Sequence, residues 1–176
     1  MGTTLKAFAL AGCALALALL AALAQSSDVV RVDAQGVELD VADDESVRRG
    51  FEPILDRLGR VDLLVNNAGI LTYAPFLDLP PERMEAMVRT NLLAPMRLTQ
   101  LIARGMAARG SGHVIMITSG AARTAVPLGS VYCATKHALS ALGRVLRIEL
   151  QGLGIRVSEV APGTVETDIR QSSTHP

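Results

Sequence analysis

The stretch Val61-Asp62-Leu63-Leu64-Val65-Asn66-Asn67-Ala68-Gly69 decides the fold of this chain. It starts as an apolar run that only Asp62 interrupts, and it ends in two asparagines and a loop that contains glycine. A continuous apolar run of this length is typical of a strand that is buried on both faces of a parallel sheet. The pattern therefore predicts a parallel strand over 61–65, with the residues 66–69 at its carboxyl end facing a ligand.

The segments around this strand alternate between β-rich and helical patterns. Strands are expected over 29–32, 37–41, 61–65, 114–117 and 155–160, and helices over 43–58, 82–108 and 131–151. Pro53 should kink or shorten the first helix, and the second should be interrupted near Asn91 and Pro95. Strands that alternate with helices of this length form βαβ units. The fold class expected is α/β, a Rossmann-like doubly wound parallel sheet with helices on both faces.

Composition excludes several classes of protein. The chain has 176 residues, 17 basic against 17 acidic side chains and no formal net charge, so it lacks the basic footprint of a nucleic-acid binder. Hydrophobic residues make up 49% of it, which is too much for a disordered chain. Cys13 and Cys133 are far apart, and neither has a second Cys or His at metal-ligand spacing. Neither a disulfide framework nor a metal site is expected.

The first segment, 1–24, has several possible interpretations. Residues 7–24 form an uncharged Ala/Leu run of 18 residues that follows Lys6. Such a run resembles a secretory signal, and it is also near the lower length limit of a membrane anchor. A buried helix packed on the sheet, or a degenerate first helix of the domain, fits equally well, because periodicity does not separate these cases. The cytoplasm is the expected location, with export or membrane attachment through 7–24 as the alternative.

A tyrosine and a lysine stand one helical turn apart in the predicted helix 131–151. The chain has only two tyrosines and two lysines, and Tyr132 and Lys136 share one helix face. A phenol, with a reference pKa of about 10, works as a base at neutral pH when a nearby cation stabilises the phenolate. Ser119 ends the preceding strand, where its hydroxyl would hold a substrate oxygen against the phenol. The alternative is a surface tyrosine beside a solvated lysine.

These residues, taken together, resemble a known family. The set comprises Asn66-Asn67-Ala68-Gly69, Asn91, Ser119, Tyr132-x-x-x-Lys136 and Pro162-Gly163 with Thr167. It is similar to the classical short-chain dehydrogenase/reductase family over about Val37 to Asp168, and Asp40-Val41 matches the family's adenine-contacting strand end. The resemblance implies an oxidoreductase that transfers a hydride between NAD or NADP and a small-molecule alcohol or carbonyl substrate. It also implies a homodimer or homotetramer formed through the helices 82–108 and 131–151.

The resemblance also assigns roles to individual residues. Tyr132 would be the general acid/base, and Lys136 would lower its pKa and hold the nicotinamide ribose. Ser119 would orient the substrate oxygen, and Asn91 would hold a water that relays protons to Lys136. The residues implied in cofactor binding are Asp40, Val41, Asn66, Ala68, Gly69, Tyr132, Lys136, Pro162, Gly163 and Thr167.

Several of these residues also have a purely structural interpretation. In that interpretation Asn66 only ties neighbouring strands together, because a buried asparagine must find partners in any case. Asn91 would then simply bend the long helix. His137 is adjacent to Lys136 but points elsewhere on the helix, so we expect it to pack rather than to catalyse. Cys133 is expected to be a small core residue.

The sequence departs from the family pattern at both ends. The glycine-rich phosphate turn that should follow the first strand is absent, because Gly2 and Gly12 are the only glycines before Gly36. The last helix and strand of the family are also missing, which points to truncation at both ends. The expected organisation is an apolar segment 1–24, a domain over 25–170 and a polar tail 171–176.

The departures and the coenzyme leave questions open. An alternative function is therefore a catalytically weak or inactive homologue that acts through association. The coenzyme also stays open, because Asp33 would favour NAD and Arg31 would favour NADP. The substrate itself is not readable from the sequence.

Overall fold

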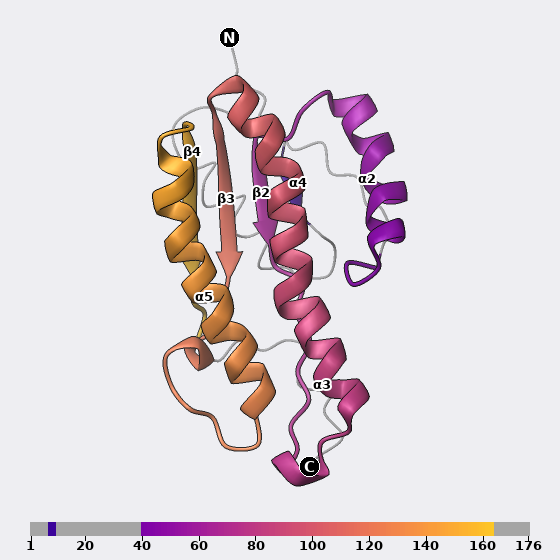
Figure 1. Cartoon of the computed structure of the whole chain (residues 1–176), viewed down its shortest axis with the longest axis vertical. Coiled ribbons are helices and arrows are strands. Elements are labelled where there is room, and N and C mark those ends of the chain that lie inside the picture. The colour runs from indigo at the N-terminus through magenta and orange to yellow at the C-terminus, as the bar shows by residue number, and fades with distance from the viewer. Residues whose placement is uncertain (1–6, 10–39, 164–176) are drawn as a thin grey trace.

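Four parallel strands form the sheet that carries the fold. The computed structural model describes residues 7–9 and 40–163 of the chain. The strands are β1 Ala7–Ala9, β2 Leu63–Asn66, β3 Gly112–Ile117 and β4 Ile155–Val160, and their order across the sheet is β1-β2-β3-β4. In the register, Ala7 lies opposite Leu63, and Ile117 opposite Val160. Because all pairs are parallel, the carboxyl ends of β2, β3 and β4 lie at one edge of the sheet (Figure 1).

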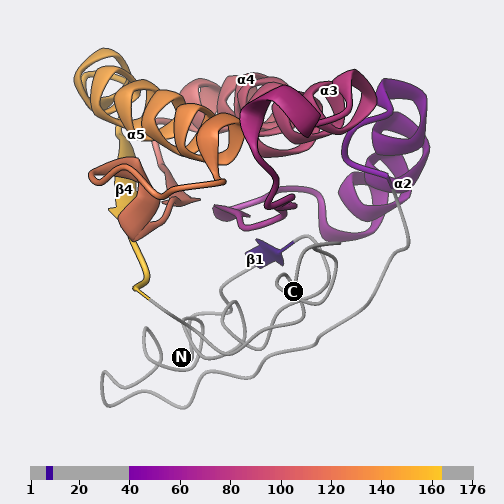
Figure 2. The same ribbon diagram turned by 90° about the horizontal axis from the view of Figure 1, so that it is seen from below.

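The described helices cover one face of this sheet. They are α2 Asp44–Leu58, α3 Pro81–Val88, α4 Ala94–Arg109 and α5 Ser130–Gln151, with a π-helical turn η2 Arg89–Leu93 between α3 and α4. Two short 3-10 turns, η1 Phe76–Asp78 and η3 Gly120–Ala122, lie in the loops. Figure 2 shows the helices in a layer on the same side of the strands. The predicted α/β class with a parallel sheet is confirmed, and helices on the second face stay a prediction.

Side chains on both faces of the strands are buried. Leu64, Val114 and Met116 point to the helices and join Phe51 of α2 and Leu139 of α5 in the main core. The alternate residues of the same strands form a second apolar cluster, made of Leu63, Val65, Ile115 and Ile117. Because both faces of β2 and of the second half of β3 are buried, these two strands contain continuous apolar runs.

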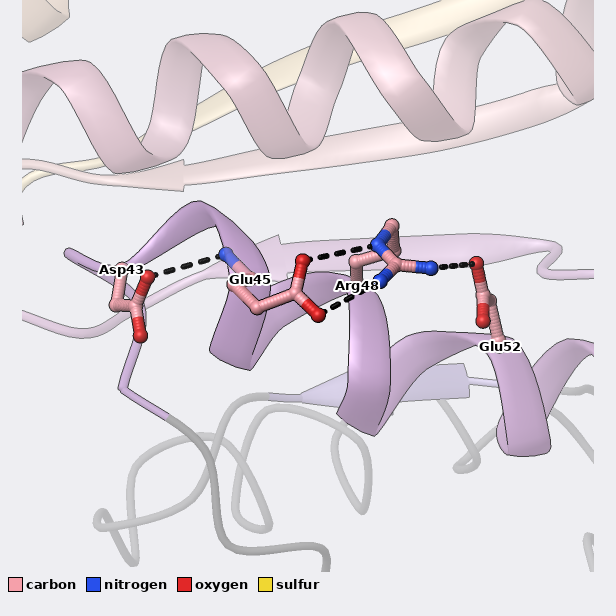
Figure 3. A network of polar contacts seen from close by, with 4 residues as sticks. All are labelled: Asp43, Glu45, Arg48 and Glu52. Atoms are coloured by element: carbon pink, nitrogen blue, oxygen red, sulfur yellow. Dashed lines mark hydrogen bonds and ion pairs between the residues drawn. The ribbon is translucent and has the colours of Figure 1, made fainter.

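Helix α2 begins at a side-chain cap. The carboxylate of Asp43 accepts a hydrogen bond from the Glu45 backbone N–H at 3.1 Å and so satisfies one of the free donors at the helix start. On the exposed side of the same helix, Arg48 bridges Glu45 and Glu52 (Figure 3). The hydrogen bond from Arg48 lowers the pKa of Glu45. The first turn is thus closed by local contacts, as the acidic start of the segment predicts.

Most predicted elements are confirmed, with boundaries that shift by at most two residues. The strand expected over 155–160 has those bounds, and the helix expected over 131–151 begins one residue earlier. Helix α2 continues through Pro53 to Leu58, so this proline does not shorten it, and a kink at Pro53 stays a prediction. The interruption expected near Asn91 is real, because the π-helical turn lies there.

Two expectations near the start of the chain need correction. Ala7–Ala9, which the apolar run placed in a helix, form strand β1 beside β2. An uncharged Ala/Leu run fits a buried strand as well as a helix, and pairing with β2 supplies its backbone hydrogen bonds. The strand expected over 37–41 does not include Asp40 or Val41, which lie in a turn. The Asp40 carboxylate accepts the Ala42 N–H at 2.8 Å, which favours a turn over a strand.

The remaining parts of the first segment lie outside the described residues. Among the helices that the structure describes, none is long and apolar enough to cross a membrane. Residues 10–24, the strand expected over 29–32, Arg31 and Asp33 all lie outside the described ranges. A signal, an anchor and membrane attachment through 7–24 therefore stay predictions, as does the cytoplasmic location.

Gly154, just before β4, lies very close to Gly110, just before β3. Its φ is +73°, and an added Cβ would overlap the Gly110 carbonyl oxygen. We expect Gly154→Ala to lower the free energy of unfolding by about 2–5 kcal/mol, combining left-handed strain with steric overlap. Gly59→Ala is the matched control, because Gly59 has φ +71° but open space around it, and its cost is about 1 kcal/mol. Urea unfolding measures both, and equal costs would contradict the close approach.

Candidate active site

The residues that follow β2, β3 and β4 meet the start of helix α5. Ser119 comes two residues after the end of β3, and Pro162 two residues after the end of β4. The Gly120 N–H donates to the Pro162 carbonyl at 2.9 Å, so these two loops touch. Gly69, after β2, also lies close to α5, because a Cβ added to it would be 3.5 Å from the Lys136 Nζ. The structure thus brings together the predicted site residues of three loops.

Ser119 is held in place by its own turn. Its Oγ accepts the Ala121 N–H at 3.1 Å, which caps the short turn η3. The Ser119 side chain also hydrogen-bonds Tyr132. A hydroxyl that is already oriented by the backbone costs little further ordering when it holds a substrate oxygen.

Tyr132 is partly buried at the start of α5, and its pKa lies above the usual value for a phenol. Burial is the largest cause, because it disfavours the phenolate, and the hydrogen bond from Ser119 opposes it. The nearby Tyr73 and Cys133 add to the rise. That Lys136 lowers this pKa stays a prediction: its Nζ lies over the ring, 5.8 Å from the centroid, and burial is the larger influence on the phenol.

Lys136 is a buried cation with a defined partner. Its side chain is 4% exposed, and its Nζ donates to the Ile117 carbonyl oxygen at 3.0 Å. Burial lowers the pKa of Lys136 from 10.5 to about 8, because the charged form loses its hydration. An ammonium has three donors, so a group with one bond to Ile117 keeps capacity to hold ligand oxygens. At near-neutral pH such an amine can also release its proton.

Asn91 braces the site from the π-helical turn. It is fully buried, its Oδ1 accepts the Ile70 N–H at 2.8 Å, and its Nδ2 donates to the Ile70 carbonyl at 2.9 Å. The Nδ2 also donates to Thr135 Oγ1 at 3.2 Å, and that hydroxyl donates to the Tyr132 carbonyl. Asn91 therefore joins the loop after β2 to the helix turn that carries the tyrosine and the lysine. π-Helical turns often lie at functional sites because they re-aim one side chain.

Asn66 makes contacts that fit its structural interpretation. Its Nδ2 donates to Thr99 Oγ1 of α4 at 2.9 Å and lies 3.3 Å from the Met116 sulfur of β3. These contacts tie β2 to its neighbours, as a buried asparagine in that role would. Its Oδ1 is buried without a partner, so an acceptor remains available there. A role in cofactor binding for Asn66 stays a prediction.

Asp40 and Val41 lie away from the tyrosine, in the loop before α2. Asp40 is exposed, and its backbone N–H donates to Ser46 Oγ at 2.8 Å. Val41 lines a cavity of about 140 Å³ together with Ala42, Arg89, Leu93, Ala94 and Arg97. The adenine contact predicted for Val41 therefore concerns a separate small cavity beside η2 and α4, and Asp40 is not among the residues that line it.

Four other residues from the sequence analysis have different outcomes. Cys133 is a buried residue, as expected. The His137 Nδ1 lies 2.9 Å from the Cys133 carbonyl, a contact within the helix that fits packing. Gly163 follows Pro162 at the end of the described chain, and Thr167 lies outside the described residues. Within the described part of the chain, no three His, Cys, Asp or Glu side chains gather as a metal site would need.

Sequence reasoning missed two residues that support this site. Thr135 lies inside the Tyr132-x-x-x-Lys136 motif, and a helical wheel places it on the face of Tyr132. In the structure its hydroxyl accepts a hydrogen bond from Asn91. Glu159 of β4 receives a hydrogen bond from Thr118 at 2.8 Å. No local pattern in the sequence pointed to that pair, because the two residues lie 41 positions apart.

The lowered pKa of Lys136 makes stability depend on pH. Between about pH 8 and 10.5, the unfolded chain keeps the lysine proton and the folded chain has lost it, so stability rises with pH. The rise contributed by Lys136 is up to about 3 kcal/mol over that window. We expect Lys136→Met to remove this rise. The measurement is the free energy of unfolding in urea of the parent and of the variant, each followed from pH 7 to 10. Parallel pH curves for the two proteins would contradict a buried, deprotonating lysine.

Comparison with known proteins identifies the family. The family model described as short chain dehydrogenase matches residues 4–176. An L-xylulose reductase from Mesocricetus auratus is 39% identical over 142 residues, covering 78% of this chain and 57% of the relative. A dehydrogenase/reductase SDR family member 7B from Danio rerio is 37% identical over 133 residues, covering 76% of this chain and 43% of the relative.

Solved structures agree with these relatives. A gluconate 5-dehydrogenase from Burkholderia cenocepacia, in complex with NADP and tartrate, has a TM-score of 0.71 at 36% identity and covers 76% of this chain and 52% of its own. An acetoin dehydrogenase from Salmonella typhimurium has a TM-score of 0.72 at 37% identity, with coverages of 78% and 54%. The chain spans about half the length of the relatives that it matches. It belongs to the short-chain dehydrogenase/reductase family of oxidoreductases.

Proposed function

We propose that this chain transfers a hydride between a nicotinamide dinucleotide and an alcohol or carbonyl substrate, with Tyr132 as the general acid/base. The observation that carries the proposal is the meeting of three groups after β3. The Ser119 hydroxyl hydrogen-bonds Tyr132, and the Lys136 Nζ lies against the ring of that tyrosine. A phenol, a hydroxyl and an ammonium at one place form a site that can bind an oxygen and move a proton to or from it.

The residues of this site fit a nicotinamide dinucleotide. Lys136 would bind ribose hydroxyls with the donors that its bond to Ile117 leaves over, and Gly69 keeps the space beside its Nζ free of a side chain. The unpartnered Asn66 Oδ1 is a further acceptor at the end of β2. Ala68, Pro162, Gly163 and Thr167 are the other residues proposed for the cofactor, with Asp40 and Val41 toward the adenine. NAD or NADP, when bound, would supply the hydride acceptor or donor.

The protein's own part in the reaction is positioning and proton transfer. In the reducing direction Ser119 would orient the substrate carbonyl, and the Tyr132 hydroxyl would donate a proton to its oxygen. Burial lowers the pKa of Lys136 to about 8, so its amine would give up and take back a proton beside Tyr132 near neutral pH. Asn91 and Thr135 would keep the first turns of α5 in register with the loop after β2.

The catalytic proposal is tested by two variants of the same residue type. We expect the full chain to bind NADH or NADPH saturably, as followed by cofactor fluorescence. Tyr132→Phe should keep that binding and lower turnover roughly 10²- to 10⁴-fold in a screen of small ketones and alcohols. Tyr73→Phe, which changes the chain's other tyrosine, is the matched control and should have the smaller effect. Equal losses in the two variants would contradict the assigned role.

Association is the second proposed function, and a groove supports it. Helices α4 and α5 border an apolar groove of about 430 Å³. It is lined by Met96, Arg97, Thr99, Gln100, Ala103, Arg104, Ala107, Leu142, Leu146, Leu150 and Leu153. Apolar surface of this kind is stabilised when a partner covers it. We propose that a second copy of the chain covers it, in a homodimer or homotetramer, which serves a catalytically weak homologue as well as an active one.

Oligomeric state tests this second proposal. Leu153 is 47% exposed at the end of the groove, so Leu153→Glu places a charge where the second copy would pack. We expect this variant to shift the mass measured by light scattering toward the monomer. Leu77→Glu is the control, because Leu77 is 95% exposed and lies outside the groove. A parent protein that is already monomeric at high concentration would refute the interface.

A further inference from the structure

Glu159 places a carboxylate between the sheet and helix α5. It lies on β4, which forms one edge of the described sheet, and it is only partly exposed. Its Oε1 accepts a hydrogen bond from the Thr118 hydroxyl at 2.8 Å, and the Ser140 side chain of α5 lies near enough to the carboxylate to help lower its pKa. Thr118 and Ser140 are both buried, with exposures of 3% and 4%. One side chain of β4 therefore holds the end of β3 and the middle of α5.

The surroundings keep this carboxylate charged. Burial raises the pKa of Glu159, but the hydrogen bonds from Thr118 and Ser140, with Arg123 and Arg144 nearby, outweigh it and lower the pKa. A charged acceptor makes shorter and stronger hydrogen bonds than a neutral one. The 2.8 Å contact from Thr118 is therefore a hydrogen bond to a charged acceptor, and Ser140 lies beside the same carboxylate.

Both partners of Glu159 are neighbours of site residues. Thr118 stands between Ile117, whose carbonyl binds the Lys136 Nζ, and Ser119, which hydrogen-bonds Tyr132. Ser140 follows Lys136 by one helical turn and faces the sheet. The carboxylate thus connects the segment that carries the serine to the helix that carries the tyrosine and the lysine.

Backbone pairing alone does not make this connection. The Thr118 N–H donates to the Val160 carbonyl at 2.8 Å, and the Gly120 N–H donates to the Pro162 carbonyl at 2.9 Å. These bonds hold β3 and its loop to β4, but they do not reach helix α5. The distance between the strand end and the helix is set by side chains, and Glu159 contacts both sides of that gap.

We propose that Glu159 is a positioning residue, which sets the separation between Ser119 and the Tyr132–Lys136 pair by holding Thr118 and Ser140. The inference rests on the function proposed above for these three groups. Glu159 touches none of the reacting atoms and acts through the placement of Ser119. Displacing a positioned group by about 1 Å costs up to about 10² in rate.

The test reads the ionisation of Tyr132 directly, without a cofactor. The chain has two tyrosines and no tryptophan, so Tyr73→Phe leaves a single phenol whose phenolate absorbance is followed between pH 9 and 11. Far-ultraviolet circular dichroism checks the fold at each pH. Ser119→Ala in this background is the reference, because losing the hydrogen bond from Ser119 moves the titration to higher pH.

We expect Glu159→Ala to move the phenol titration in the same direction as Ser119→Ala, and Glu159→Gln, which keeps an acceptor for Thr118, to move it less. Glu149→Gln is the matched control, since Glu149 is an exposed carboxylate of α5, and its titration should coincide with the background. A loss of stability alone would not shift the phenol's pKa in the folded protein. Unchanged titration in Glu159→Ala, with a shift in Ser119→Ala, would overturn the proposal.

Two further measurements keep the result decisive. If Glu159→Ala does not fold, Thr118→Val removes the same hydrogen bond from the other side, and an unshifted titration in that variant overturns the proposal equally. Where the parent turns over a substrate, Glu159→Ala should lower kcat roughly 10- to 100-fold and leave dinucleotide affinity within a few-fold. A parent without turnover would count against the proposed function, while the phenol titration would still decide the role of Glu159.

Discussion

The hydrogen bond from the Lys136 Nζ to the Ile117 carbonyl is the interaction on which the site depends. An ammonium group that is 4% exposed has lost most of its hydration, and it remains in the interior because a carbonyl oxygen and an aromatic ring face it. The same burial lowers its pKa to about 8. This contact joins helix α5, which carries the tyrosine and the lysine, to the end of β3, which leads into the serine.

The rest of the site keeps this connection in register. Asn91 pairs with both backbone groups of Ile70 and then donates to Thr135, so it connects the loop after β2 to the first turns of α5. The π-helical turn is what lets a fully buried asparagine point in this direction from a long helix. On the opposite side, Glu159 connects β4 with both the strand end and the helix. Polar groups in a low-dielectric interior are well fixed when all are partnered.

Local patterns were enough for most of the fold but not for its edges. The strand of 63–66 starts with three apolar residues because both of its faces are covered, and that run indicated it directly, whereas the strand of 155–160 mixes Ile155, Val157 and Val160 with polar residues. The apolar run at Ala7–Ala9 did not separate strand from helix, because the choice depends on pairing with β2, which lies more than fifty residues away. Asp40 and Val41 followed β-like residues, but an aspartate that binds a backbone N–H two residues on favours a turn.

The sequence by itself determined which chemical groups this protein can bring to a reaction. The four-residue spacing of Tyr132 and Lys136 places them on one helix face whatever the rest of the chain does, and Ser119 at a strand end follows from the apolar run before it. Only the tertiary structure decided the state of those groups. The pKa of Tyr132 rises and that of Lys136 falls because both are buried by segments distant in sequence. Glu159 and Thr118 meet across 41 positions, because strand pairing and not local pattern brings them together.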